Sequence, residues 1–133
     1  MKAEYSTGGP ILKVRFHADD DDGKETARGV SMVRDVLEIR LNENLLASKI
    51  HHNHLALITL MSVHHFVRKT LYMDLKVSSE FAKVVQDLCP YDVEFESTKG
   101  KEYVPNPNSK PCLAFSGGVD STAALMLMPK DTV

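Results

Sequence analysis

Hydrophobic and polar residues alternate along four short stretches within the first hundred positions. The first stretch runs Leu12, Lys13, Val14, Arg15, Phe16 and His17. The same alternation returns in residues 37–42, 71–77 and 92–96. A period of two places apolar side chains on one face of a strand and polar side chains on the other. The pattern therefore predicts four half-buried strands.

Two further stretches have helical spacing. Residues 51–69 carry apolar side chains three and four positions apart, with others between them, which predicts a helix buried on most of its surface. Residues 78–88 predict a second helix, because Ser78 is a suitable N-cap and Pro90 cannot continue a helix. We expect residues 1–10 to be a flexible entry and residues 99–111, rich in Gly, Pro and Asn, to be a linker.

These elements predict an α/β protein that divides near residue 105. Residues 1–104 are expected to form an α+β domain whose antiparallel or mixed sheet is covered on one face. Nothing in this domain has a chemical signature, so it is left open whether it holds a substrate, supports a homodimer or partner subunit, or covers the sheet. Residues 105–133 are expected to begin a second, doubly wound domain that is incomplete here.

The beginning of that second domain has the pattern of a phosphate-binding turn. A short apolar run, residues 112–115, predicts a buried strand, and residues 122–128 predict an apolar helix. Between them, Gly117 and Gly118 let the main chain approach a ligand, so that backbone N–H groups can point at phosphate oxygens. The N-terminus of the following helix favours an anion at the same place. For Asp120, helix capping and Mg²⁺ binding are both open from the residue type alone.

The run Ser116-Gly117-Gly118-Val119-Asp120-Ser121 resembles the SGGxDS loop of the N-type ATP pyrophosphatases, also called the PP-loop or adenine nucleotide alpha-hydrolase-like superfamily. Five fixed residues of average abundance match a given starting position by chance about once in a million. The absence of a Gly-Lys-Ser/Thr sequence distinguishes the loop from a Walker A motif. The resemblance covers only this short part of the chain.

The resemblance implies a nucleotide-binding role for this segment and an ATP-dependent adenylation reaction that releases AMP and pyrophosphate. It implies cofactors ATP and Mg²⁺, with Asp120 as metal ligand and a nucleotide site made of Ser116, Gly117, Gly118, Val119, Asp120, Ser121 and Thr122. Catalytic residues are not identified. The acceptor, a small molecule or tRNA, is not identified either.

Two alternatives to an adenylating ligase or transferase stay open. One is a truncated or degenerate loop that binds nucleotide without turnover, and the other is a muropeptide-precursor epimerase that acts through adenylation. Because the adenine pocket of the superfamily comes from later strands, we expect this chain to be the N-terminal part of a longer protein and to be inactive alone.

Composition adds few constraints. The net charge is −2 and 26% of residues are charged, so no overall basic character points to nucleic acid. Cys89 and Cys112 form no CxxC pair and are expected to be reduced thiols. The first residues lack the apolar core of a signal peptide and no apolar run has the length of a membrane span. A cytoplasmic location without membrane contact is the expectation.

Histidines and aspartates form two further clusters. Five of the six histidines lie close together at positions 51, 52, 54, 64 and 65, but none of the pairs has the i, i+4 spacing of a helical zinc motif. They are expected to be helix-end or surface residues, with a substrate contact as the less favoured interpretation. Asp19 to Asp22 lack the EF-hand pattern and are expected to form a solvated acidic turn.

Overall fold

The protein has an α/β fold with a five-stranded mixed sheet and two helices. The computed structural model describes residues 1–23, 31–41, 49–104 and 107–108. The chain divides into two units, Met1–Tyr103 and Val104–Val133. All helices and strands described below belong to the first unit.

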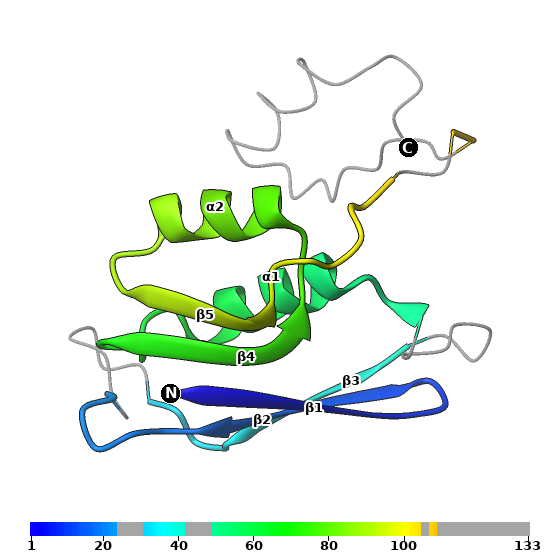
Figure 1. The fold of residues 1–133 in the computed structure, drawn as a ribbon. Helices are drawn as coiled ribbons and strands as arrows, with labels where there is room; N and C mark the ends of the chain where they lie inside the picture. The colour runs from blue at the N-terminus through cyan, green and yellow to red at the C-terminus, as the bar shows by residue number, and fades with distance from the viewer. Residues whose placement is uncertain (24–30, 42–48, 105–106, 109–133) are drawn as a thin grey trace, which may run out of the picture. The chain divides into compact units, whose positions relative to one another are not determined.

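The sheet combines an antiparallel half with a parallel half (Figure 1). Its strands are β1 (Lys2–Gly8), β2 (Ile11–His17), β3 (Val36–Arg40), β4 (Thr70–Lys76) and β5 (Asp92–Ser97). They lie in the order β3-β2-β1-β4-β5. β1, β2 and β3 are paired antiparallel, whereas β4 is parallel to both β1 and β5. The mixed sheet expected from the sequence is therefore confirmed.

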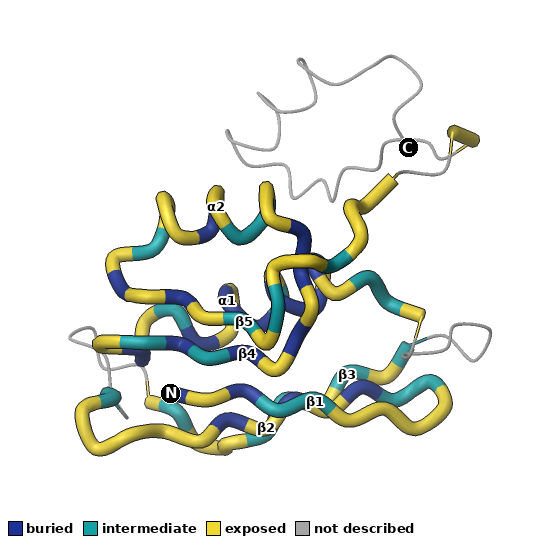
Figure 2. Tube along the Cα trace, viewed as in Figure 1, coloured by how far each residue is buried: buried dark blue, intermediate teal, exposed yellow. Residues whose placement is uncertain are grey.

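One face of the sheet forms the core. Leu12, Val14, Leu71 and Met73 are fully buried, while the residues between them point to the polar face. Figure 2 shows this alternation of buried and exposed positions along β2 and β4. Helix α1 (His52–Val63) and helix α2 (Ser79–Leu88) cover the apolar face and contribute the rest of the core. Coverage of one face was expected from the alternating pattern.

The first residues form a strand, so the expectation of a flexible entry is wrong. β1 pairs with β2 over its whole length, from Lys2 opposite His17 to Gly8 opposite Ile11. Gly9 and Pro10 form the hairpin turn, and Gly9 has a φ of 59°, a left-handed conformation that glycine adopts readily. The sheet consequently has five strands, one more than predicted.

Helix α1 is shorter than the predicted 51–69 helix and ends at Val63. Phe66 and Val67 remain buried although the helix has ended, because the chain turns there and keeps both side chains in the core. The loop before residue 24 binds this turn: the Gly23 N–H donates to the Phe66 carbonyl oxygen at 2.9 Å. Apolar spacing alone does not distinguish such a turn from continued helix.

Helix α2 begins and ends as predicted. The Ser78 hydroxyl accepts a hydrogen bond from the Phe81 N–H at 3.3 Å, which makes Ser78 the N-cap. The helix ends at Leu88, two positions before Pro90. Its N-cap joins it directly to the end of β4, so β4, α2 and β5 form a β-α-β unit with parallel strands.

The acidic turn is more than a solvated loop, and that expectation is wrong for Asp22. The Asp22 side chain is only 2% exposed and lies 2.9 Å from the terminal ammonium group of Met1. It also accepts hydrogen bonds from the N–H groups of Asp19 and Arg68, at 2.8 and 3.2 Å. Burial acts to raise the pKa of Asp22, but the Met1 ammonium group, together with the two N–H donors, outweighs it and lowers the pKa below its ordinary value of 3.8.

Candidate functional site

The residues predicted to bind ATP lie outside the described part of the chain. They are Ser116, Gly117, Gly118, Val119, Asp120, Ser121 and Thr122, and Asp120 is also the predicted Mg²⁺ ligand. Cys112 lies outside the described residues as well. These assignments stay predictions. Within the described residues, two hollows in the first unit bring chemically distinct side chains together.

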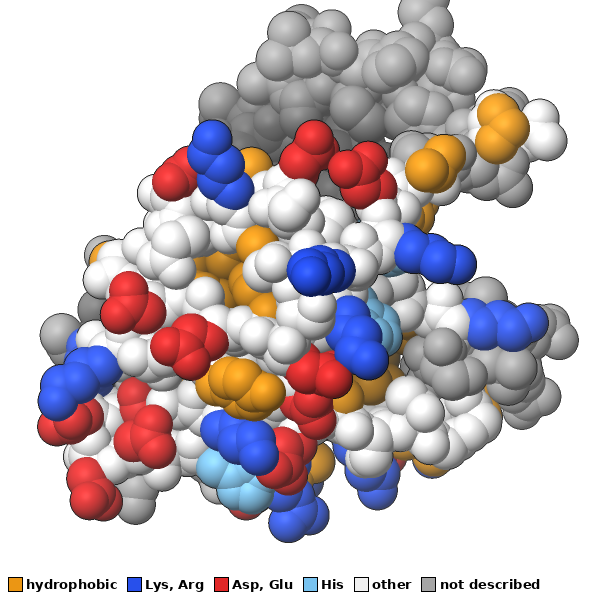
Figure 3. Space-filling model, in the orientation of Figure 1, with side chains coloured by type: hydrophobic (Ala, Val, Ile, Leu, Met, Phe, Trp, Pro, Cys, Tyr) orange, Lys and Arg blue, Asp and Glu red, His pale blue; other side chains and the backbone are white. Residues whose placement is uncertain are grey.

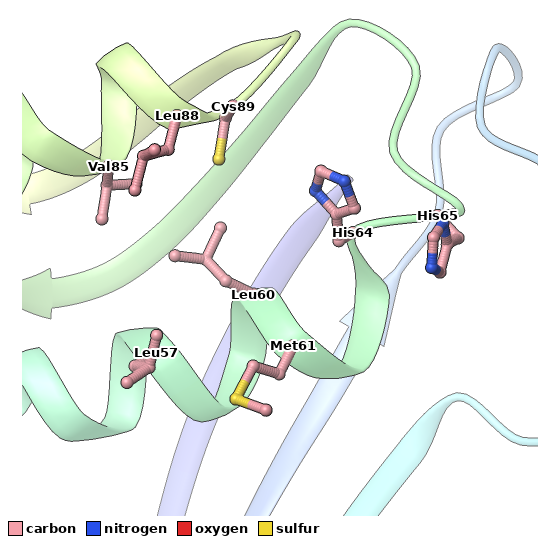
Figure 4. Close-up of a pocket in the computed structure, with 8 residues that line it drawn as sticks. All are labelled: Leu57, Leu60, Met61, His64, His65, Val85, Leu88 and Cys89. Atoms are coloured by element: carbon pink, nitrogen blue, oxygen red, sulfur yellow. The ribbon is translucent and has the colours of Figure 1, made fainter. Parts of the chain in front are cut away.

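The first hollow is an apolar groove between the two helices (Figure 4). It has a volume of about 360 Å³ and is lined by Leu57, Leu60, Met61, His64, His65, Val85, Leu88 and Cys89. Met61 on α1 is 78% exposed and Leu88 on α2 is 76% exposed. Helix α1 also contains no charged residue. The groove therefore presents apolar surface to solvent on both sides.

The polar groups around this groove are not arranged for nucleophilic chemistry. Burial raises the pKa of the Cys89 thiol, although a hydrogen bond with Tyr91 acts in the opposite direction. Burial likewise raises the pKa of Tyr91, whose hydroxyl lies 3.1 Å from His64 Nδ1. At neutral pH both groups keep their protons, and a protonated thiol is a poor nucleophile. The groove can bind an apolar group but lacks an activated nucleophile.

The second hollow is lined by cationic and imidazole side chains. We call it the lysine pocket and define it by Ile50, His51, His52, Lys76, Lys99, Gly100 and Lys101. Its volume is about 360 Å³, and among the residues that the structure describes, none that line it is acidic. It lies where β4 and β5 end, next to the first turn of α1.

Hydrogen bonds between distant segments build the lysine pocket. The Lys76 N–H, at the end of β4, donates to His52 Nδ1 at 2.9 Å and so holds the start of α1 against that strand. The Gly100 N–H donates to the Val77 carbonyl oxygen at 2.8 Å. A Cβ atom at Gly100 would lie 2.2 Å from the Lys76 carbonyl oxygen. Only glycine therefore allows this close approach, which positions Lys99 and Lys101.

A buried polar pair fixes the start of α1 beside the pocket. Asn53 Nδ2 donates to the Ser78 hydroxyl, and the Ser78 N–H donates to Asn53 Oδ1, both at 3.1 Å. Both residues are buried, with 8% and 4% exposure. Because Ser78 lies two positions after the end of β4 and caps α2, this pair joins the starts of both helices to one end of the parallel strands.

The histidines occupy helix ends and surface positions, as expected. His51 is the N-cap of α1 and its Nδ1 accepts from the Asn53 N–H, while His64 is the C-cap. The ring of exposed His54 lies with its centroid 4.4 Å from that of Tyr103, and His65 is exposed. Among the described residues, no group of three potential ligands is placed to bind a metal ion.

The lysine pocket was not predicted from the sequence, because residues 99–111 have the Gly, Pro and Asn content of a linker. One signal was present: Lys76 lies near the end of one predicted strand, and Lys99 lies shortly after the end of another. If the two strands are parallel neighbours, their carboxyl ends meet at one edge of the sheet, and the lysines come together there. The sequence did not predict that these two strands are parallel neighbours, so the two lysines could not be placed at the same edge of the sheet.

Comparison of the sequence with protein-family models, with curated proteins and with solved structures gave no match. The fold and the pockets are therefore interpreted from the residues of this chain alone. In the part of the chain that the structure describes, the helices are too short or too polar to cross a membrane.

Proposed function

We propose that the protein binds ATP with Mg²⁺ through residues 116–121 and belongs to the ATP-pyrophosphatase type of adenylating enzymes. The observation that carries this proposal is the sequence Ser-Gly-Gly-Val-Asp-Ser between an apolar run and an apolar helical pattern. The proposal includes the finer fold assignment, in which residues 112–128 open a doubly wound parallel sheet.

The residue types fit the chemistry of a bound pyrophosphate group. Gly117 and Gly118 supply backbone N–H groups that can approach phosphate oxygens without a side chain in the way. Ser116 and Ser121 supply hydroxyl donors to the same oxygens. Asp120 supplies the hard oxygen ligand that Mg²⁺ prefers, and the metal ion compensates the repulsion between carboxylate and phosphate.

The proposed reaction transfers AMP. An oxygen of the acceptor attacks the α-phosphorus of ATP, a new phosphorus–oxygen bond forms, and the bond to the β-phosphate bridging oxygen breaks. Pyrophosphate leaves with the bonding electron pair, and its charge is compensated by Mg²⁺ and by the N–H groups of the loop. No oxidant or reductant is needed. The acceptor is a small molecule or tRNA.

Mg-ATP binding to the full-length protein tests the first part of the proposal. We expect Asp120→Ala and Ser116→Ala each to weaken binding at least about tenfold, which corresponds to loss of one charge-assisted contact. Asp131→Ala and Ser109→Ala are matched controls, since they remove the same groups outside the loop. Unchanged affinity in both loop variants would refute ATP binding at this loop.

Release of pyrophosphate tests the second part. An adenylating enzyme must release one pyrophosphate for each AMP transferred, whereas a protein that only binds nucleotide releases none. We expect pyrophosphate release that depends on an added acceptor and is lost in Asp120→Ala. Tight Mg-ATP binding without any release, over a panel of carboxylate and tRNA acceptors, would favour a non-catalytic nucleotide-binding role.

A further inference from the structure

We propose that the lysine pocket is a binding site for a small, multiply charged oxyanion, such as a phosphate ester or a polycarboxylate. The described residues that line this site lie between positions 50 and 101. It is thus separate in sequence from the proposed ATP loop, and the proposal does not rest on ATP binding.

The charge of the lining favours an anion. Lys76, Lys99 and Lys101 surround one pocket, and none of the described residues that line it is acidic. Lys76 has a distant partner in Glu96, at 3.5 Å, while Lys99 and Lys101 make no ion pair with any other described residue. Lysines on the polar face of the sheet differ, because Lys2 and Lys13 lie 2.7 and 3.1 Å from glutamates. The lysine charges in the pocket are thus less compensated by other described residues than those on the polar face of the sheet.

The histidines add directional donors. His51 Nδ1 accepts from the Asn53 N–H at 3.2 Å, and His52 Nδ1 accepts from the Lys76 N–H at 2.9 Å. Each ring therefore uses Nδ1 as an acceptor and carries its proton on Nε2. The pocket then combines imidazole N–H donors with three ammonium groups. The N–H groups of Lys99 and Gly100 already donate to Ser97 and Val77, so side chains would hold the anion.

The position in the fold favours an anion as well. β4 and β5 end at this edge, and both α1 and α2 begin at it (Figure 1). Ligands of sheets with parallel strands commonly bind outside the carboxyl ends of those strands. The N-termini of two helices carry partial positive charge at the same edge, which adds to the field of the lysines. Figure 3 shows blue Lys and Arg side chains beside a pale blue histidine, right of centre.

The size of the pocket favours a small molecule over a nucleic acid. A volume of about 360 Å³ is that of a small-ligand site. A nucleic-acid interface would need a longer basic surface, but elsewhere on the described sheet the lysines and glutamates are interspersed. The net charge of the chain is also negative, at −2.

The test is a residue-resolved NMR titration of the 133-residue chain with inorganic phosphate and, separately, with citrate. We expect the largest shifts at the amides of residues 99–101 and at the His51 and His52 rings. The double variant Lys99→Ala/Lys101→Ala should lower the affinity at least about tenfold. Lys2→Ala/Lys13→Ala is the matched control, because it removes two exposed lysines from the polar face of the sheet and should leave the affinity unchanged.

The two titrants show whether the pocket prefers phosphate groups or carboxylate groups. Saturable binding of phosphate alone favours a phosphate ester, and saturable binding of citrate alone favours a polycarboxylate. Shifts spread over all lysines, or equal effects of the two double variants, would overturn the proposal and indicate nonspecific screening. A single-stranded oligonucleotide that binds the same residues far more tightly than either anion would also overturn it, in favour of a nucleic-acid interface.

Unchanged amide spectra outside the pocket establish that the variants are folded. The same spectra separate this proposal from the function proposed above. Shifts confined to residues 116–121 would support the ATP loop and refute the lysine pocket. Shifts confined to the pocket would support the lysine pocket, while the ATP loop is tested by the Mg-ATP measurements described above.

Discussion

Removing the side-chain amide of Asn53 is the sharpest test of how the first unit is held together. The amide makes two hydrogen bonds with Ser78, each 3.1 Å long, and both residues are buried. Asn53→Ala breaks both bonds at once. It also leaves the Ser78 N–H buried without its acceptor, whereas the Ser78 hydroxyl still accepts from the Phe81 N–H.

The magnitude follows from these contacts. Each lost hydrogen bond costs about 1 kcal/mol, and a buried donor without a partner costs about 1 to 3 kcal/mol. Because the second cost partly includes the first, we expect a loss of about 3 kcal/mol in the free energy of unfolding. For a unit of about 100 residues this corresponds to a fall in Tm of at least about 12 °C.

Urea denaturation followed by circular dichroism measures this loss. Asn53→Asp should lose less than Asn53→Ala, because a carboxylate oxygen can still accept from the Ser78 N–H and is favoured near a helix N-terminus. Ser62→Ala is the matched control: its exposed hydroxyl donates to the Ile58 carbonyl oxygen at 2.8 Å, and its loss should cost less than about 0.5 kcal/mol. A loss below about 1 kcal/mol for Asn53→Ala at unchanged m-value would refute the reasoning.

Three further predictions concern other contacts of the first unit. Gly100→Ala should cost about 1 to 3 kcal/mol in urea denaturation, because its Cβ would meet a β4 carbonyl oxygen at 2.2 Å; Gly8→Ala, with nothing within 4 Å, should be nearly neutral. Asp22 stabilises the fold fully above its ordinary pKa of 3.8, and its contribution falls as pH drops through the lower folded-state pKa. Asp22→Asn should therefore make stability less steeply dependent on pH below about 4, measured by thermal melts across an acid series. Tyr5→Phe should lower the free energy of unfolding by about 1 kcal/mol in the same melts, because it removes the hydroxyl that lies 2.7 Å from Thr59 Oγ1. The Thr59 hydroxyl would still donate to the Leu55 carbonyl oxygen within α1. An unchanged free energy of unfolding would contradict the contact between Tyr5 and Thr59.

Local patterns in the sequence predicted most of the elements but not their pairing. β2 and β4 bury every second side chain, and β3 and β5 alternate less exposed with more exposed side chains, so all four strands carry a signal with a period of two. β1 gives almost none, since Ala3 is its only fully buried residue and most of its other side chains are polar. Its strand conformation depends on two neighbours that are distant in sequence from one another, and no local rule includes them.

The two candidate sites also differ in whether their residues are close together in the sequence. The proposed ATP loop is contiguous, so its six residues could be found in the sequence without any structure. The lysine pocket combines residues from 50–52, 76 and 99–101, and they are brought together by the parallel pairing of β4 and β5 and by the hydrogen bond from Lys76 to His52. Asp22 was missed for a related reason: its partner is the terminal ammonium group, which no motif represents.

The narrow contact between β1 and β4 has a consequence for how the chain folds. Only Lys2 opposite Tyr72 and Ala3 opposite Met73 are paired there, whereas β1 and β2 pair over their full length. The hairpin and the β-α-β unit can each form from contacts that are close in sequence. Their junction must close a loop between Met1 and Thr70, which are 69 positions apart, and this is the larger entropic cost. We expect the junction to form after the folding transition state, so that mutations at Ala3 accelerate unfolding and leave the folding rate nearly unchanged.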